Sequence, residues 1–194
     1  MARTGSVRRD TKETRISTSI DLDGRGEVEV STGLGFLDHM IEALSRHGRF
    51  DVRIEAEGDL HIDDHHVVED VAITLGQAVD RALGDRAGIE RFGHAYVPMD
   101  EALARAAWDL SGRAFAVVEL GLRRNRLGQV ATENLRHFLQ SFATSSRSAL
   151  HVDLLRGDND HHRAEAAFKA TGVALRHAVT LGPWADVPST KGSL

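Results

Sequence analysis

A duplicated motif is the feature that most constrains the fold of this chain of 194 residues. The segment Asp64–Glu69 reads Asp-His-His-Val-Val-Glu, and the segment Asp160–Glu165, 96 residues later (160 minus 64), reads Asp-His-His-Arg-Ala-Glu. A second pair, Leu-Asp-His-Met at 37–40 and Leu-Arg-His-Phe at 135–138, is offset by 98 residues (135 minus 37). Two matches at nearly the same offset predict a fold built from two similar halves.

The apolar pattern gives the first half a definite order of elements. Alternating residues predict strands at 13–22 and 27–31, and the turn-forming sequence Asp-Gly-Arg-Gly at 23–26 predicts that these strands pair as a hairpin. Helical spacing of apolar residues from Phe36 to Leu44 predicts a helix that ends at Gly48. A strand at 50–56 follows, and Asp63 or Asp64 is expected to cap a long second helix.

The second half repeats this order. We predict a joining strand at 88–98, strands at 102–110 and 113–120 turned through Ser-Gly, a helix at 132–146, a strand at 149–155 and a helix at 160–179. The sequence therefore predicts an α+β fold of two fused, pseudo-symmetric repeats, at about residues 8–92 and 93–182, followed by a tail at 183–194 without a regular pattern.

Composition narrows the chemistry. The chain has no cysteine, which excludes disulfides and thiolate metal sites and leaves histidine and carboxylate as ligands. A formal net charge of -5 argues against a general nucleic-acid or anionic-membrane surface. No stretch approaches the ~18 apolar residues of a membrane span, and the polar N-terminus lacks the apolar core of a signal peptide. We expect a cytoplasmic protein.

The spacing within the duplicated motif suits metal binding. Residues i and i+4 lie on one face of a helix, so His65 with Glu69 and His161 with Glu165 can each share an ion. The following histidine of each pair lies about 100° around the helix and can serve another ion or another ligand set. A solvated helix face would explain one such motif, but its repetition favours metal.

The matched histidines on the earlier helices complete the inventory. Six histidines and two glutamates give three nitrogens and one oxygen to each of two ions, with open positions for substrate. This set favours Mn or Fe over structural Zn, with Co and Ni also compatible. The predicted metal ligands are His39, His65, His66, Glu69, His137, His161, His162 and Glu165.

Four segments, at 35–40, 64–70, 98–102 and 188–192, are together similar to the imidazoleglycerol-phosphate dehydratase family of histidine biosynthesis, in its single-function form. The resemblance spans nearly the whole chain. It implies four helices packed between two mixed β-sheets, the ribosomal protein S5 domain 2-like fold, and two Mn(2+) ions per active site. It also implies trimers assembled into a 24-subunit shell, with sites at subunit interfaces.

The resemblance further implies the dehydration of D-erythro-imidazole glycerol phosphate to imidazole acetol phosphate. The proton to be removed has no adjacent carbonyl, so we expect the substrate imidazole to be held between two ions as an imidazolate. Its electrons expel the neighbouring hydroxyl to give a diazafulvene, which is then deprotonated to an enol.

Site residues carried over from the family fall into two groups. Those expected to move protons are Glu13, Asp100 and Glu165. Those expected to bind the phosphorylated imidazole substrate are Glu13, His39, His47, His65, Glu69, Arg91, Arg113, His161, Lys169, Ser189 and Lys191, so the tail contributes to phosphate binding.

Two alternatives remain at this stage. A dinuclear metallohydrolase would use the same ligands to activate water against a phosphoester. A non-catalytic metal-storage or scaffold protein would bind metal without turnover.

Overall fold

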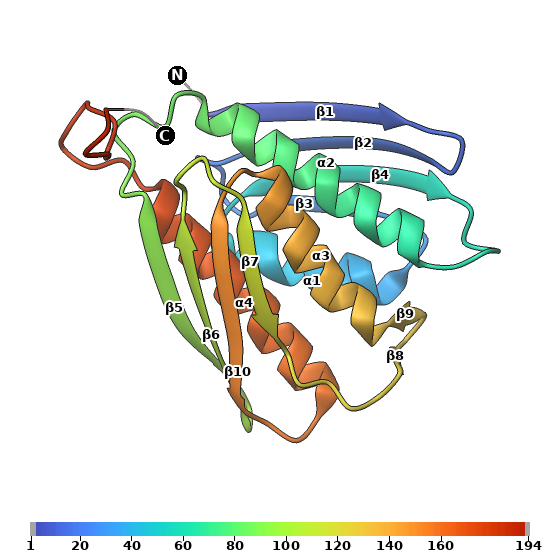
Figure 1. The fold of residues 1–194 in the computed structure, drawn as a ribbon. Helices are drawn as coiled ribbons and strands as arrows, with labels where there is room; N and C mark the ends of the chain where they lie inside the picture. The colour runs from blue at the N-terminus through green and yellow to red at the C-terminus, as the bar shows by residue number, and fades with distance from the viewer. Residues whose placement is uncertain (1–2, 193–194) are drawn as a thin grey trace.

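The structure, a computed structural model, describes residues 3–192 as an α+β fold in which helices lie between two sheets (Figure 1). The first sheet contains β1 (Thr4–Asp10), β2 (Thr14–Asp21), β3 (Val28–Ser31) and β4 (Asp51–Gly58). The second contains β5 (Phe92–Met99), β6 (Ala102–Asp109), β7 (Phe115–Glu119) and β10 (Ala149–Arg156). The helices are α1 (Gly35–Gly48), α2 (His65–Leu83), α3 (Thr132–Ser145) and α4 (Asp160–Val179), and β8 (Arg126–Leu127) pairs with β9 (Val130–Ala131).

Strand order shows the duplication directly. The first sheet has the order β1-β2-β4-β3 and the second the order β5-β6-β10-β7. In each sheet the first two pairings are antiparallel and the last is parallel. The prediction of two fused repeats with four helices between two mixed sheets is therefore confirmed.

Both predicted hairpins are wrong in the same way. β4 lies between β2 and β3, and β10 lies between β6 and β7, so β2 is not a neighbour of β3 and β6 is not a neighbour of β7. In the first half the backbone N–H groups of residues 25–27 donate to Asp51 Oδ1 at 2.7–2.9 Å, which holds this loop across the start of β4. A long-range contact thus overrides the local turn signal.

The true hairpin of the first sheet is β1–β2, and the sequence did not reveal β1. Val7 is the only apolar side chain in this strand, whose residues otherwise read Thr-Gly-Ser and Arg-Arg-Asp. Alternation of apolar and polar residues is consequently too weak to predict it. β1 is held in the sheet by backbone pairing with β2 and by packing against α2.

Helix packing brings the two halves together. α1 packs on α4, and α2 packs on α3. Gly76 and Gly172 occupy matched positions, 96 residues apart (172 minus 76), and a Cβ at either would overlap a backbone oxygen of the facing helix, Phe142 O or Leu44 O. These close approaches set helix residues from different halves side by side. No helix among residues 3–192 combines the length and apolar character needed to cross a membrane.

Candidate metal centres

The paired histidines lie at the first turns of α2 and α4. Asn159 caps α4, because its Oδ1 accepts the backbone N–H of His161 at 2.9 Å. At α2, Asp63 Oδ1 accepts the N–H of His65 at 3.3 Å, whereas Asp64 makes no side-chain cap hydrogen bond. Of the two predicted caps, only Asp63 accepts a backbone N–H of the first turn.

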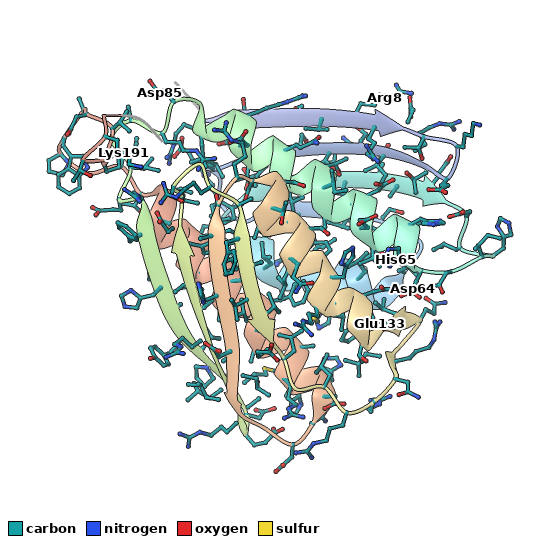
Figure 2. The ribbon with its side chains drawn as sticks, in the orientation of Figure 1. Arg8, Asp64, His65, Asp85, Glu133 and Lys191 are labelled. Carbon is teal, nitrogen blue, oxygen red and sulfur yellow. The ribbon has the colours of Figure 1, made fainter. Side chains whose placement is uncertain are left out.

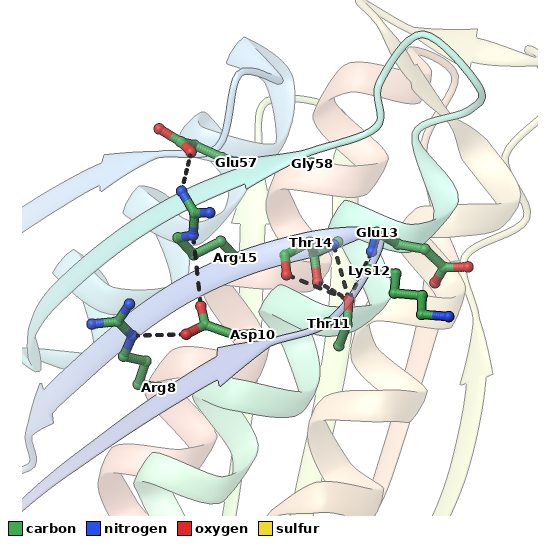
Figure 3. Close-up of a pocket in the computed structure, with 9 residues that line it drawn as sticks. All are labelled: Arg8, Asp10, Thr11, Lys12, Glu13, Thr14, Arg15, Glu57 and Gly58. Carbon is green, nitrogen blue, oxygen red and sulfur yellow. Dashed lines mark hydrogen bonds and ion pairs between the residues drawn. The ribbon is translucent and has the colours of Figure 1, made fainter.

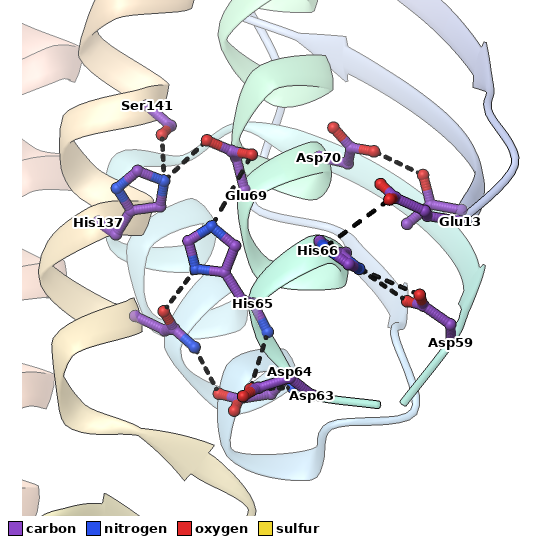
Figure 4. A network of polar contacts seen from close by, with 12 residues as sticks. Glu13, Asp59, Asp63, Asp64, His65, His66, Glu69, Asp70, His137 and Ser141 are labelled. Carbon is purple, nitrogen blue, oxygen red and sulfur yellow. Dashed lines mark hydrogen bonds and ion pairs between the residues drawn. The ribbon is translucent and has the colours of Figure 1, made fainter. Parts of the chain in front are cut away.

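The first ligand trio consists of His65, Glu69 and His137 (Figure 4). His137 Nε2 lies 2.8 Å from Glu69 Oε1, and His65 Nε2 lies 4.0 Å from Glu69 Oε2. The two imidazole rings stack with centroids 4.9 Å apart. One donor atom from each residue falls within 4.8 Å of the others, so the three side chains can converge on one cation.

The second trio consists of His39, His161 and Glu165. His39 Nε2 and His161 Nε2 lie 3.4 Å and 3.2 Å from Glu165 Oε2. Lys169 Nζ lies 2.7 Å from the other carboxylate oxygen. Burial raises the pKa of Glu165, but the hydrogen bond and charge of Lys169 outweigh it, so the pKa is lowered and the group is held as a carboxylate.

Each trio takes ligands from both halves of the chain. The first joins α2 of the first half to His137 on α3, and the second joins α4 of the second half to His39 on α1. The close helix pairs described above make this exchange possible. The structure therefore brings together six of the eight predicted ligands as two matched groups.

The remaining two, His66 and His162, lie outside the trios. His66 Nδ1 contacts Asp59 Oδ2 at 3.0 Å, and its Nε2 lies 3.9 Å from Glu13 Oε1. The hydrogen bond with Asp59 raises the pKa of His66. With Nδ1–H donated to the carboxylate, the neutral ring keeps an Nε2 lone pair that a ligand can use.

His162 is held in the matching way. Its Nδ1 contacts Glu101 Oε2 at 2.7 Å, and its Nε2 lies 3.6 Å from Asp100 Oδ2. The hydrogen bond with Glu101 raises the pKa of His162. Backbone N–H groups, first that of Asn159, together with His162 lower the pKa of Glu101 to about 2.

Sequence reasoning missed the residues that support the trios. His65 Nδ1 donates to Asn134 Oδ1 at 3.0 Å, and Asn134 Nδ2 donates to Asp64 Oδ2 at 3.0 Å. This relay fixes the tautomer that leaves His65 Nε2 free for a metal. The aspartate before each histidine pair was visible in the duplication, but its partner was not.

Glu13 sits in the turn between β1 and β2, beside a hollow of about 530 Å³ (Figure 3). Thr11 Oγ1 accepts the N–H groups of Glu13 at 3.1 Å and Thr14 at 2.9 Å, which shapes the turn. Thr14 Oγ1 in turn donates to Asp70 Oδ2 on α2 at 2.6 Å. The turn is thereby fixed next to His66, and the Glu13 side chain remains about half exposed, at 54%.

Two of the predicted phosphate ligands share one aspartate. Arg91 Nε donates to Asp109 Oδ1 at 2.7 Å, and its Nη1 donates to Pro188 O at 2.7 Å. Arg113 Nη2 lies 3.8 Å from Asp109 Oδ2. The structure therefore groups Arg91 and Arg113 through Asp109, and Arg91 also contacts the tail at Pro188.

The other predicted substrate residues are divided between two places. In the tail, Ser189 Oγ accepts the N–H of Lys191 at 3.2 Å. Figure 2 shows Lys191 at the opposite end of the molecule from His65. His47 instead lies on α1, the helix that carries His39, and burial followed by the charge of Lys169 lowers its pKa. One chain alone does not gather all the predicted substrate residues around a trio.

Comparisons with known proteins all identify one family. The sequence model of imidazoleglycerol-phosphate dehydratase matches residues 32–175. Relatives of that name include one from Candida glabrata, 53% identical over 97% of this chain and 98% of its own length. One from Methylorubrum populi is 54% identical over 99% of this chain and its full length. One from Phytophthora nicotianae is 56% identical over 99% of this chain, which spans only 42% of that protein.

Solved structures agree with the sequence comparisons. Imidazoleglycerol-phosphate dehydratase from Staphylococcus aureus superposes with a TM-score of 0.83 at 36% identity, over 92% of this chain and 99% of that one. The enzyme from Pyrococcus furiosus also gives a TM-score of 0.83, at 38% identity over 97% and 100% of the two chains.

Proposed function

Because the chain belongs to the imidazoleglycerol-phosphate dehydratase family, hydro-lyases of histidine biosynthesis, we propose that it dehydrates imidazole glycerol phosphate at two divalent-metal centres. The product is imidazole acetol phosphate. The observation that carries the proposal is the pair of His-His-Glu trios, each with donors within 4.8 Å of one another.

The donor chemistry fits a metal. Each trio offers two imidazole nitrogens and one carboxylate oxygen, without sulfur, which suits Mn(2+) and also Fe, Co, Ni or Zn. The orientation of His65 by Asn134 is the kind of outer hydrogen bond that metal-binding histidines make. We propose two Mn(2+) ions per active site.

Three donors leave each centre short of the predicted four, and this favours an assembled enzyme. His66 and His162 present Nε2 atoms outside the trios of their own chain. We propose that these histidines complete the trios of neighbouring copies, in the predicted 24-subunit shell of trimers. Figure 2 shows Lys191 and His65 at opposite ends of the molecule, which supports the same arrangement, in which the tail of one copy binds phosphate at the site of another.

Protein side chains supply proton transfer and orientation. Divalent ions held by the two trios would lower the pKa of the substrate imidazole and orient its ring, which is the chemistry that the route expected from the sequence requires. Glu13, fixed in its turn by Thr11, is the proposed acid and base at the reacting carbons. Asp100, next to His162, and Glu165 are further candidates for proton transfer.

We propose that cationic side chains and one hydroxyl group bind the substrate phosphate. Arg91, Arg113, Lys191 and Ser189 are the proposed ligands of the substrate phosphate, with Lys169 and His47 beside the second trio. The arginines offer planar N–H donors suited to a phosphate. Because both contact Asp109, their guanidinium groups lie close to each other before a phosphate binds.

The test is an assay of purified, Mn-loaded protein with imidazole glycerol phosphate, following the enolised product. We expect Glu13→Gln to lower kcat by about 10²- to 10⁴-fold while metal content stays constant. Glu57→Gln is the matched control, because Glu57 lines the same hollow but pairs with Arg15 at its exposed rim. Release of inorganic phosphate without the enolised product would instead indicate a metallohydrolase, and metal binding without turnover would indicate a storage or scaffold protein.

A further inference from the structure

The two trios have equivalent donors but different neighbours. Residues at matched positions beside them differ in charge and in hydrogen-bonding ability. Lys169, four residues after Glu165, corresponds to Ile73, four residues after Glu69. Asn134, which holds His65, corresponds to Phe36, which contacts His161.

Lys169 changes what Glu165 can offer to a cation. Its ammonium lies 2.7 Å from Glu165 Oε1, and both side chains are largely buried, with exposures of 15% and 9%. A divalent ion at Oε2 would therefore meet a carboxylate already neutralised by a neighbour, and would be repelled by that neighbour at short range. Burial strengthens both the attraction and the repulsion, so it does not remove the effect.

Glu69 carries no such restraint. Its contacts are with His137 Nε2 at 2.8 Å and His65 Nε2 at 4.0 Å, and the helix position facing it holds the uncharged Ile73. The full negative charge of this carboxylate is available to an ion.

The histidines His65 and His161 also differ in a way that favours metal binding at the first trio. The relay from Asp64 through Asn134 sets both the tautomer and the orientation of His65 before a metal arrives. The matched His161 meets the Phe36 ring edge-on, with centroids 5.3 Å apart, which restricts the ring but does not select a tautomer. Metal binding at the first trio should therefore cost less side-chain conformational entropy than binding at the second.

We propose that the two metal centres are unequal, so that a divalent cation binds first and more tightly at His65, Glu69 and His137, and second at His39, His161 and Glu165. Lys169 and Asn134 are the positioning residues that set the order. The inference rests on the proposed function only in taking both trios as metal sites.

The experiment is a titration of metal-free protein with Mn(2+), measuring free Mn(2+) by electron paramagnetic resonance and requiring no turnover. We expect two ions per chain in two steps, with dissociation constants at least about 10-fold apart, the scale of outer-shell effects on metal affinity. Two indistinguishable sites would overturn the inference and leave the proposed function standing. Absence of Mn(2+) binding would overturn both.

Reciprocal variants identify the cause. Lys169→Met should tighten the second step and bring it toward the first, whereas Ile73→Lys should weaken the first step, because it places an ammonium beside Glu69. Ile73 is partly exposed, so its replacement is compatible with the fold, and circular dichroism checks both variants. An inequality that persists unchanged in Lys169→Met would contradict the role of Lys169 in setting the order.

Discussion

Asp64 and Asp160 stand at the same position in the two halves, directly before the paired histidines, but they hold different parts of the molecule. Asp64 Oδ2 accepts the N–H of Ala131 at 2.8 Å and Asn134 Nδ2 at 3.0 Å. Asp160 Oδ2 accepts the N–H groups of residues 123 and 124 at 2.8 Å and 2.6 Å. Asp64 connects to a histidine of the first trio through Asn134, whereas Asp160 holds a loop and pairs with Arg163 on α4 at 3.2 Å.

The duplication therefore preserves some features of the two halves and not others. Strand order, helix pairing and ligand positions are the same in both halves. The hydrogen bonds and charges around the ligands are not, because they depend on single side chains of the opposite half. The repeat therefore fixes where two ions can bind, while residues outside the repeated motif adjust each centre.

Removing a carboxylate ligand should have the largest effect. We expect Glu69→Gln and Glu165→Gln each to lose one metal ion per chain and to lower kcat/KM by about a thousandfold, since a metal supplies several kcal/mol to the reaction. Elemental analysis and steady-state kinetics measure both results. Glu133→Gln, on the exposed first turn of α3, is the control. Full activity with one ion lost would show that one centre is not catalytic.

Alanine at the matched glycines should affect stability next most strongly. We expect Gly172→Ala to destabilise the protein by about 3 kcal/mol and Gly76→Ala by about 2 kcal/mol, because each new Cβ meets backbone that has little freedom to move. Gly172 is the tighter position. Urea unfolding at one fixed protein concentration gives the comparison, because the proposed assembly would make the measured stability depend on concentration. Equal costs would mean that the two helix pairs have equal room to adjust.

Substitution of the paired aspartates tests whether Asp64 and Asp160 have different roles. Both Asp64→Ala and Asp160→Ala should lower the free energy of unfolding by about 1 to 3 kcal/mol, because backbone N–H groups in partly buried hydrogen bonds lose their acceptor. Only Asp64→Ala should also weaken the tighter Mn(2+) step, by about 10-fold, through the loss of Asn134 orientation. A similar loss of Mn(2+) affinity in Asp160→Ala would show that both aspartates act on the metal.

The sequence predicted what depends on local pattern. Helical spacing located α1 and α3 to within a residue or two, and the duplication led to the six ligands that meet in the trios. Lys169 could also have been placed beside Glu165, because the two are four residues apart on a predicted helix.

What could not be predicted depends on contacts between distant segments. Insertion of β4 between β2 and β3 requires pairing across a helix, and no turn signal reports it. The bond between Asp64 and Asn134 joins residues 70 positions apart. Likewise, Asp160 holds the backbone N–H groups of residues 123 and 124, and Arg126 begins β8, although no local pattern reports either contact.

Asp51 provides the smallest test, because its matched position in the second half is Ala149, 98 residues later (149 minus 51). Backbone N–H groups of residues 27, 25 and 26 lower the pKa of Asp51 below its ordinary value of 3.8. A lowered folded-state pKa adds stability that is fully present above that ordinary value and is lost as the pH falls through the lower folded value.

We therefore expect Asp51→Asn to lower the free energy of unfolding by about 1 kcal/mol at pH 7, since a charged acceptor is replaced by a neutral one. The difference should shrink below pH ~4, as the wild-type carboxyl takes up its proton. Glu55→Gln, exposed on the same strand, should change stability little at either pH. Urea unfolding at both pH values measures the effect, and a difference that stays constant with pH would mean that the charge of Asp51 does not hold the loop.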